Sequence, residues 1–107
     1  MNNLINCLIV DDEPMAREIL ENHLGKIDSI SLVGSCKNAI EAFNMLNTHP
    51  IDLIFLDINM PEKDGFELLE MLDEVPITVF TTAYDEYAIK SFEYNALDYL
   101  LKPMIQY

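Results

Sequence analysis

The sequence predicts an α/β fold built on a doubly wound, five-stranded parallel sheet. Strand-like and helix-periodic segments alternate along the chain. The strand-like segments are apolar almost throughout rather than at alternate positions, which is typical of strands covered on both faces. The chain has 107 residues, half of them apolar, which is enough for a single core. No repeat or linker divides it, so we expect one domain over residues 1–107.

The elements follow in strict alternation. Five strand-like runs are expected at residues 5–10, 31–36, 52–56, 77–82 and 96–101. The segments between them carry apolar residues at helical spacing, and Pro14 suits the first position of the first helix. The residues at that spacing are Ala16, Ile19, Leu20, His23, Leu24 and Ile27; Ala39, Ile40, Phe43 and Leu46; Gly65, Leu68, Leu69 and Leu72; and Ala88, Ile89 and Phe92.

The charge of the chain limits its partners. The formal net charge of −13 argues against direct binding to nucleic acid or to an anionic membrane. No apolar run approaches the roughly 20 residues of a membrane span, and the first residues do not resemble a signal peptide. Cys7 and Cys36 stand singly in apolar runs, as expected of buried, reduced thiols in a cytoplasmic protein.

Polar residues gather where the predicted strands end. The first strand runs into Asp11 and Asp12, the third into Asp57, the fourth into Thr82 and the fifth into Lys102. Ligands of open α/β sheets bind beyond the carboxyl ends of the strands. We therefore expect these side chains to meet at one edge.

Such a cluster of carboxylates requires a positive charge among them. Lys102 supplies one, and a divalent cation would supply more. The available ligands are oxygen atoms, which favours Mg²⁺ or Mn²⁺ over zinc. An Asp carboxylate beside such an ion could attack phosphorus. From spacing alone, Asp11 and Asp12 could equally cap the helix that begins near Pro14.

Four motifs in order, Asp11-Asp12, "LDINMPEKDG", "FTTAYDEYA" and "ALDYLLKP", resemble the receiver domain of two-component response regulators over nearly the whole chain. The segment "TTAYDEYAIKSFEYNALDYLLKP" is most similar to receivers that precede a LytTR-type DNA-binding domain. The resemblance implies a flavodoxin-like strand order, 2-1-3-4-5. It also implies that Asp57 accepts a phosphoryl group from a histidine kinase.

The resemblance extends to the other residues of the site. It implies Mg²⁺ bound by Asp11, Asp12 and Asp57, and by the backbone carbonyl of Asn59. Thr82 and Lys102 would contact the phosphoryl group. Tyr99 would be the aromatic residue that moves with Thr82, and Pro103 would follow a cis peptide bond.

The resemblance also implies a larger protein. Only five residues follow Lys102, so the final helix of a receiver is missing and we expect it, with an output domain, beyond Tyr107. That domain would bind DNA, and the receiver would form a homodimer on activation.

Two alternatives use similar residues. Phosphohydrolases of the haloacid dehalogenase type need a second Asp two residues after the nucleophile as a general acid. Asn59 stands there, which favours a phosphoacceptor with at most slow self-catalysed turnover over an enzyme. A flavodoxin-like protein that binds FMN would need a Ser- and Gly-rich loop where "VDDEPMA" stands.

Overall fold

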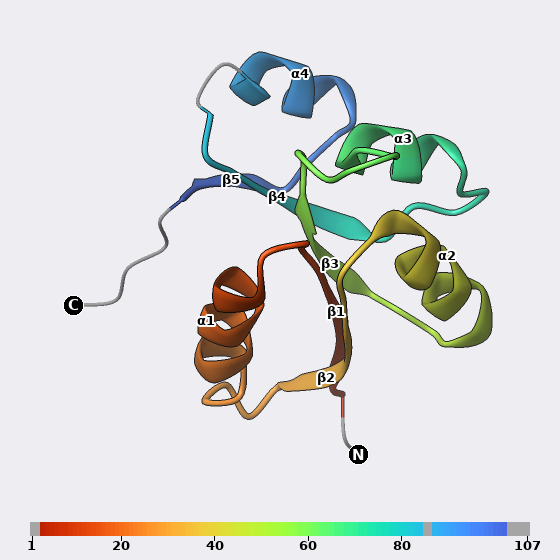
Figure 1. Cartoon of the computed structure of the whole chain (residues 1–107). Coiled ribbons are helices and arrows are strands. Elements are labelled where there is room, and N and C mark those ends of the chain that lie inside the picture. The colour runs from red at the N-terminus through yellow and green to blue at the C-terminus, as the bar shows by residue number, and fades with distance from the viewer. Residues whose placement is uncertain (1–2, 85–86, 103–107) are drawn as a thin grey trace.

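The computed structural model describes residues 3–84 and 87–102. It confirms the predicted fold: a five-stranded parallel sheet in the order β2-β1-β3-β4-β5 (Figure 1). The strands are β1 (Ile5–Val10), β2 (Ile30–Cys36), β3 (Leu53–Asp57), β4 (Ile77–Thr82) and β5 (Asp98–Leu101). The helices are α1 (Pro14–Leu24), α2 (Ala39–Thr48), α3 (Gly65–Glu70) and α4 (Ala88–Glu93).

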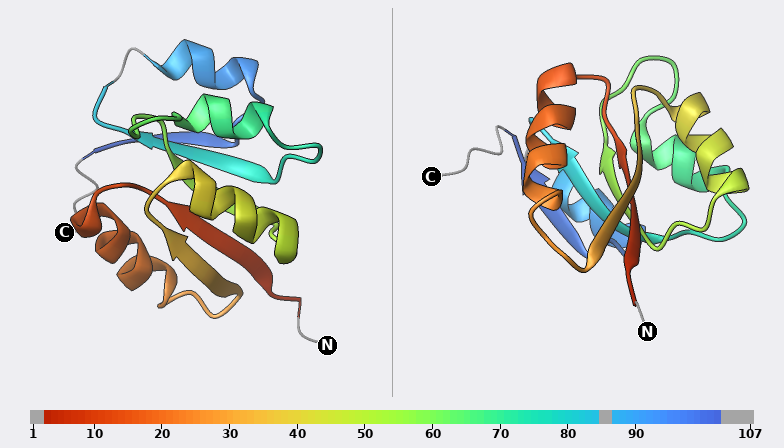
Figure 2. Two further views of the ribbon diagram at one scale, coloured as in Figure 1. Left: turned by 45° about the vertical axis from the view of Figure 1, so that its right-hand side comes forward. Right: turned by 90° about the horizontal axis from the view of Figure 1, so that it is seen from below.

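Helices cover both faces of the sheet. Helix α1 lies on one face, and α2 and α3 lie on the other (Figure 2). The core on the α1 face is small and centres on Cys7, Ile9, Leu20 and Leu24. The core on the other face is larger and holds the buried residues of α2 and α3. This arrangement leaves the carboxyl ends of the strands as the uncovered edge where polar side chains can meet.

Phe66 is the centre of the larger core, although the predicted helical spacing did not include it. Its ring lies 4.9 Å from that of Phe80 and 4.8 Å from that of Tyr94. Lys90 of α4 places its ammonium 4.6 Å from the centre of the same ring. These contacts pack α3 against β4 and against α4.

Capping residues start two of the helices. Asn38 accepts a hydrogen bond from the backbone N–H of Glu41, and Asp64 and Glu67 form a capping box at the start of α3. Gly65 is required there, because a Cβ atom at this position would lie 2.6 Å from the carbonyl oxygen of Asp57. The start of α3 is thus packed against the end of β3.

Several predicted boundaries were wrong. The first helix ends at Leu24, so Ile27 lies outside it and is exposed. Ile40 is also exposed, because Ala39 and Ala42 form the buried stripe of α2. The third strand starts at Leu53, one residue later than predicted, and the side chain of the exposed Asp52 accepts a hydrogen bond from the backbone N–H of Asn6 at 2.9 Å.

Two further differences concern the second half of the chain. The fifth strand begins only at Asp98, and Leu72 lies beyond the end of α3. The side chains of Ala88, Ile89 and Phe92 and the peptide bond before Pro103 lie outside the described residues.

Both cysteines are free and buried. Burial raises the pKa of Cys7 and of Cys36 to about 11, so both thiols are protonated at neutral pH. This agrees with the structural role expected of them. No helix in the described part of the chain is long and apolar enough to cross a membrane.

Candidate functional site

Two carboxylates are buried at the carboxyl edge of the sheet. Asp57 is the last residue of β3 and is 2% exposed, and Asp11 follows β1 and is 0% exposed. The backbone N–H of Asp11 donates to the carbonyl oxygen of Cys36 at 3.0 Å, which fixes the chain where it leaves β1. Pairing of β1 with β3 brings the two residues to neighbouring strand ends, as the sequence predicts.

Lys102 reaches both buried carboxylates from the far edge of the sheet. Its Nζ lies 2.9 Å from Oδ2 of Asp11 and 3.5 Å from Oδ2 of Asp57, and it also contacts Glu13. The backbone N–H of Lys102 donates to the carbonyl oxygen of Thr82 at 2.7 Å, which holds the residue at the end of β5. The sequence predicted the partnership with Asp11 and Asp57 but assigned no role to Glu13.

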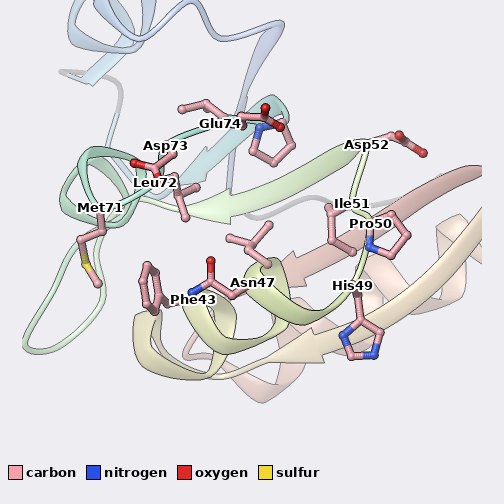
Figure 3. Close-up of a pocket in the computed structure, with 13 residues that line it drawn as sticks. Phe43, Asn47, His49, Pro50, Ile51, Asp52, Met71, Leu72, Asp73 and Glu74 are labelled. Carbon is pink, nitrogen blue, oxygen red and sulfur yellow. The ribbon is translucent and has the colours of Figure 1, made fainter.

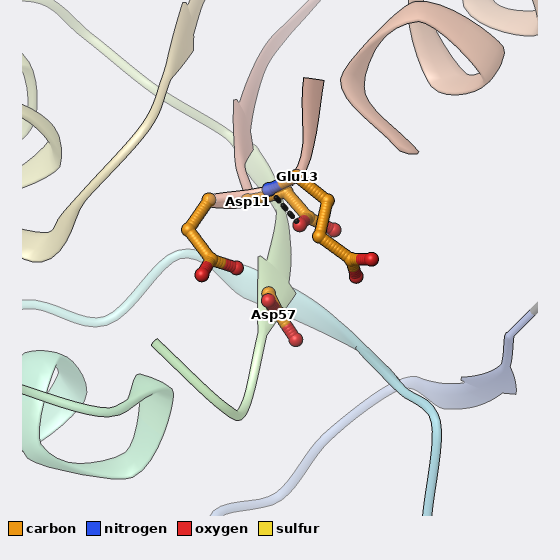
Figure 4. Close-up of side chains that lie close together, drawn as sticks. Asp11, Glu13 and Asp57 are labelled. Carbon is orange, nitrogen blue, oxygen red and sulfur yellow. Dashed lines mark hydrogen bonds between the residues drawn. The ribbon is translucent and has the colours of Figure 1, made fainter. Parts of the chain in front are cut away.

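Four acidic residues converge on this edge: Asp11, Asp12, Glu13 and Asp57. One carboxylate oxygen from each lies within 4.8 Å of the others. Figure 4 shows Asp11 and Glu13 approaching Asp57 from the segment between β1 and α1. One ammonium group therefore faces four carboxylates, and the cluster keeps an excess of negative charge.

The electrostatics of Asp57 reflect this excess. Burial first, and then the negative charge of Asp11, raise the pKa of Asp57 to about 8, although the charge of Lys102 acts in the opposite direction. Burial lowers the pKa of Lys102, but hydrogen bonds to Glu13 and Asp11 and the charges of Asp57 and Asp11 outweigh it and raise this pKa above its ordinary value. Without a further cation, the fold disfavours the ionised form of Asp57.

The donor set fits a hard cation. Among the described residues, Oδ2 of Asp57 is buried and receives no hydrogen bond. Its cationic contact is the ammonium of Lys102 at 3.5 Å, and a buried carboxylate oxygen without a hydrogen bond is costly. All the nearby ligands are oxygen atoms, as Mg²⁺ prefers. Three of the four residues predicted from the sequence as metal ligands, Asp11, Asp12 and Asp57, therefore bring carboxylate oxygens close together, with Glu13 beside them.

Asp11 serves the start of α1 as well. Its Oδ1 accepts a hydrogen bond from the backbone N–H of Glu13 at 2.9 Å. Arg17 donates to the carbonyl oxygen of Asp11 at 2.8 Å. The N-cap residue of α1 is nevertheless Glu13, and α1 has no side-chain cap, so the capping role that the sequence left open for Asp11 and Asp12 is not confirmed.

The loop after β3 turns back over Asp57. The backbone N–H of Asn59 donates to Oδ1 of Asp57 at 3.3 Å, and that of Gly65 donates to the carbonyl oxygen of Ile58 at 2.9 Å. Glu62 adopts a positive φ of 70° within the loop. The segment places the backbone N–H of Asn59 beside the carboxylate, whereas the role predicted for the carbonyl oxygen of Asn59 stays a prediction.

Thr82 and Tyr99 meet at the backbone of Tyr84. Oγ1 of Thr82 accepts a hydrogen bond from the N–H of Tyr84 at 3.2 Å. The hydroxyl of Tyr99 donates to the carbonyl oxygen of the same residue. One peptide segment after β4 therefore connects the two residues that the sequence predicted to move together.

Thr81 is a neighbour of Asp57 that the sequence placed at the end of the fourth strand but to which it assigned no role. It pairs with Asp57 in the register of β3 and β4 and is 0% exposed. Its Oγ1 receives no hydrogen bond among the described residues. The pair "TT" at the end of the strand was the available signal, but the strand register is needed to tell which threonine lies beside Asp57 in the sheet.

A hollow of about 640 Å³ lies at the opposite edge, between the loops that precede β3 and β4 (Figure 3). Apolar side chains such as Phe43, Ile51 and Leu72 line it, with Asp52, Asp73 and Glu74 at its rim. All three rim carboxylates are exposed to water, so the hollow lacks the buried charge of the other edge.

The comparisons with known proteins agree with the geometry. Residues 7–106 match the family model of the response regulator receiver domain. The chain is 52% identical over 103 residues to the transcriptional regulatory protein BtsR of Salmonella typhi. The aligned segment covers 94% of this chain but only 43% of BtsR. It thus spans less than half the length of this curated relative.

Solved structures show the same likeness. The response regulatory domain of MrkE from Klebsiella pneumoniae superposes with a TM-score of 0.85 at 35% identity, covering 94% of this chain and 85% of that one. The response regulator TrrA of Thermotoga maritima, solved in complex with Mg²⁺-BeF, gives a TM-score of 0.79 at 28% identity, with coverages of 94% and 89%.

Proposed function

This chain belongs to the family of response regulator receiver domains, and on that premise we propose that Asp57 accepts a phosphoryl group from a histidine of a partner kinase. The observation that carries the proposal is Oδ2 of Asp57, which is buried at the sheet edge without a hydrogen bond and 3.5 Å from Lys102. A carboxylate oxygen in this position is placed to act as a nucleophile.

The proposed reaction is a phosphoryl transfer. A carboxylate oxygen of Asp57 attacks phosphorus, a new O–P bond forms, and the bond between phosphorus and the kinase histidine breaks. Lys102 would offset the negative charge of the transferred group, and Thr82 would turn its hydroxyl from Tyr84 and donate a hydrogen bond to that group. The exposed rim above Asp57 gives access to the kinase.

The proposal includes Mg²⁺. Asp12 and Asp57 would hold the ion through side chains and Asn59 through its carbonyl oxygen, with Asp11 helping through water. When bound, the ion would favour the ionised form of Asp57 and offset charge on the phosphoryl oxygens. The cluster of carboxylate oxygens within 4.8 Å supports this assignment, as does the likeness to TrrA, whose structure contains Mg²⁺-BeF.

We propose that phosphorylation shifts a two-state equilibrium. Thr82 and Tyr99 both bind the backbone of Tyr84. If Thr82 turns its hydroxyl to the phosphoryl group, one of the two bonds to Tyr84 is lost. This arrangement supports a switch in which Thr82 and Tyr99 move together.

The output proposed for this switch is control of transcription. The named relative BtsR is a transcriptional regulatory protein more than twice as long as the matched segment. We propose that a C-terminal domain of the LytTR type binds DNA and that phosphorylation promotes a homodimer. In this proposal the protein acts in a cytoplasmic two-component pathway as a signalling domain, with at most slow self-catalysed loss of the phosphoryl group.

The family assignment does not support the phosphohydrolase alternative. The geometry disfavours it too, because the residue two positions after Asp57 is Asn59. An amide cannot exchange a proton as a general acid and base does. A phosphoaspartate at this site should therefore persist rather than turn over rapidly.

The test is to incubate the chain with acetyl phosphate and Mg²⁺ and to locate the added mass by mass spectrometry. We expect one phosphoryl group on Asp57, none in Asp57→Asn, and normal labelling in the control Asp28→Asn, which changes an exposed carboxylate distant in sequence from the cluster. A folded wild-type protein that gains no mass, or labelling that persists in Asp57→Asn, would contradict the proposal. Rapid multiple turnovers of a phosphomonoester would favour the phosphohydrolase.

A further inference from the structure

Glu13 occupies a helix-capping position without acting as a cap. It is the N-cap residue of α1, with φ −91° and ψ 118°, but its side chain makes no capping hydrogen bond. Glutamate is not among the residue types favoured at this position. Its carboxylate instead contacts Nζ of Lys102, 89 residues further along the chain. The side chain is therefore committed to the charged cluster rather than to its own helix.

Lys102 lies between the cluster's buried and exposed members. Its side chain is 10% exposed, against 0% for Asp11, 3% for Asp57 and 60% for Glu13. The ammonium is in contact with Glu13 and 2.9 Å from Asp11, but 3.5 Å from Asp57. Of its three carboxylate partners, the proposed phosphoacceptor is the most distant.

We propose that Glu13 is a positioning residue that holds the Lys102 ammonium towards α1 and so slows phosphoryl transfer to Asp57. This inference rests on the function proposed above. An arriving phosphoryl group carries up to two negative charges and competes with Glu13 for the same ammonium. Because Glu13 is mostly exposed, its carboxylate can release Lys102 into the site by turning to water, which solvates it well.

The inference differs from a general effect of charge. Any carboxylate near the site repels an anionic phosphodonor, whether or not it touches Lys102. A residue that acts through Lys102 must lose its effect when Lys102 loses its charge. The comparison of single and double variants separates these two cases.

The kinetic test uses Glu13→Gln, Lys102→Gln and the double variant, with Glu18→Gln as the control. Glu18 is an exposed glutamate of the same helix. With acetyl phosphate and Mg²⁺, we expect Glu13→Gln to gain mass about three- to tenfold faster than wild type, the size expected for one partly exposed charge in contact with its partner. Glu18→Gln should change the rate by less than about twofold. In the Lys102→Gln background, Glu13→Gln should change the rate by less than about twofold, the effect left for a carboxylate that acts only at a distance.

A second measurement needs neither metal nor phosphodonor. The chain has five lysines, so the ammonium signals of ¹⁵N-labelled protein can be resolved by NMR and that of Lys102 identified by its loss in Lys102→Gln. We expect Glu13→Gln to shift this signal and to speed its hydrogen exchange, and Glu18→Gln to leave both unchanged. An unaltered Lys102 signal in Glu13→Gln would show that the contact does not hold the ammonium.

The outcomes separate this inference from its premise. A wild-type protein that gains no mass contradicts the proposed function, and with it the role of Glu13 in that reaction. A wild-type protein that gains mass at a rate unchanged by Glu13→Gln overturns only the role of Glu13. Equal acceleration in the wild-type and Lys102→Gln backgrounds would also overturn it, because the effect would then be one of distant charge.

Discussion

The two edges of the sheet differ in what they bury. The hollow at the amino ends of β3 and β4 encloses about 640 Å³, yet its carboxylates, Asp52, Asp73 and Glu74, are all exposed. The carboxyl edge holds Asp11 and Asp57 at 0% and 2% exposure with one lysine between them. Buried charge is costly unless it is compensated.

This difference shows that size is a poor guide to the functional site of this protein. The hollow is walled by apolar side chains that already pack on the main core, such as Phe43 and Leu72. A protein of marginal stability retains uncompensated buried carboxylates where they serve a purpose. If buried charge has this cost, substitutions at the carboxyl edge should change the unfolding free energy more than substitutions at the amino edge.

The largest effect is expected from Lys102→Gln. It removes the cation beside Asp11 and Asp57, and breaking a buried charge pair costs about 3 kcal/mol of unfolding free energy. Lys37→Gln, which changes an exposed lysine, should change it by less than about 0.5 kcal/mol. Urea unfolding of both variants without Mg²⁺ at pH 8 measures this. Equal stability of the two variants would refute the view that Lys102 compensates the cluster.

Gly65→Ala should come next. A Cβ atom at this position would lie 2.6 Å from the carbonyl oxygen of Asp57, so α3 or the end of β3 must move, at a cost of about 2 kcal/mol. At Gly25 the nearest atom is 3.1 Å away, and Gly25→Ala should change stability by less than about 1 kcal/mol. Thermal unfolding compares them. We also expect slower phosphorylation in Gly65→Ala only, since it displaces Asp57.

A smaller change per step is expected from pH, although it accumulates over several pH units. The pKa of Asp57 is raised from 3.8 to about 8 by burial and by Asp11. The folded state therefore binds this proton more tightly than the unfolded state. The resulting stability is complete below pH 4 and is lost as the pH rises towards 8, by at most about 1.4 kcal/mol per pH unit.

This pH dependence can be isolated by substitution. Asp57→Asn removes the titrating group, so the difference in unfolding free energy between Asp57→Asn and wild type should grow from pH 5 to pH 8. Asn22→Ala, which changes an exposed residue without a titrating group, should give a difference that does not change with pH. Denaturant titrations without Mg²⁺ at several pH values measure both. A constant difference for Asp57→Asn would mean that burial does not disfavour its charge.

The smallest effect is expected at the rim of the hollow. Asp73→Asn and Glu74→Gln change exposed carboxylates, and each should alter the unfolding free energy by less than about 0.5 kcal/mol. Phosphorylation of Asp57 should proceed at the wild-type rate. A marked change in either quantity would show that the hollow is coupled to the carboxyl edge.

Most of the architecture could be predicted because it depends on local patterns. The nearly continuous apolar runs identify five parallel strands, and the alternation with helices leads to a doubly wound sheet. Errors appeared where local pattern and packing disagree. Ile27 and Ile40 keep helical spacing but are exposed, and Phe66, outside the predicted stripe, centres the core through its contacts with Phe80 and Tyr94.

The candidate site was predicted for a related reason: the carboxyl ends of parallel strands meet at one edge, so Asp11, Asp57 and Lys102 could be placed together from their positions in the chain. The spacing of residues along the chain could not predict which side chains lie within contact distance of one another. Thr81 faces Asp57 through the register of two strands, and Glu13 meets Lys102 across 89 residues.

The sequence by itself therefore determined the order of the elements, the chemical nature of the polar edge and the identity of the proposed phosphoacceptor, because periodicity and residue type are local properties. Only the tertiary structure decided the balance of charge at that edge. Burial, distances and hydrogen bonds depend on how strands and helices pack. The packing leaves Oδ2 of Asp57 buried without a hydrogen bond. It also places the ammonium of Lys102 closer to Asp11 and Glu13 than to Asp57.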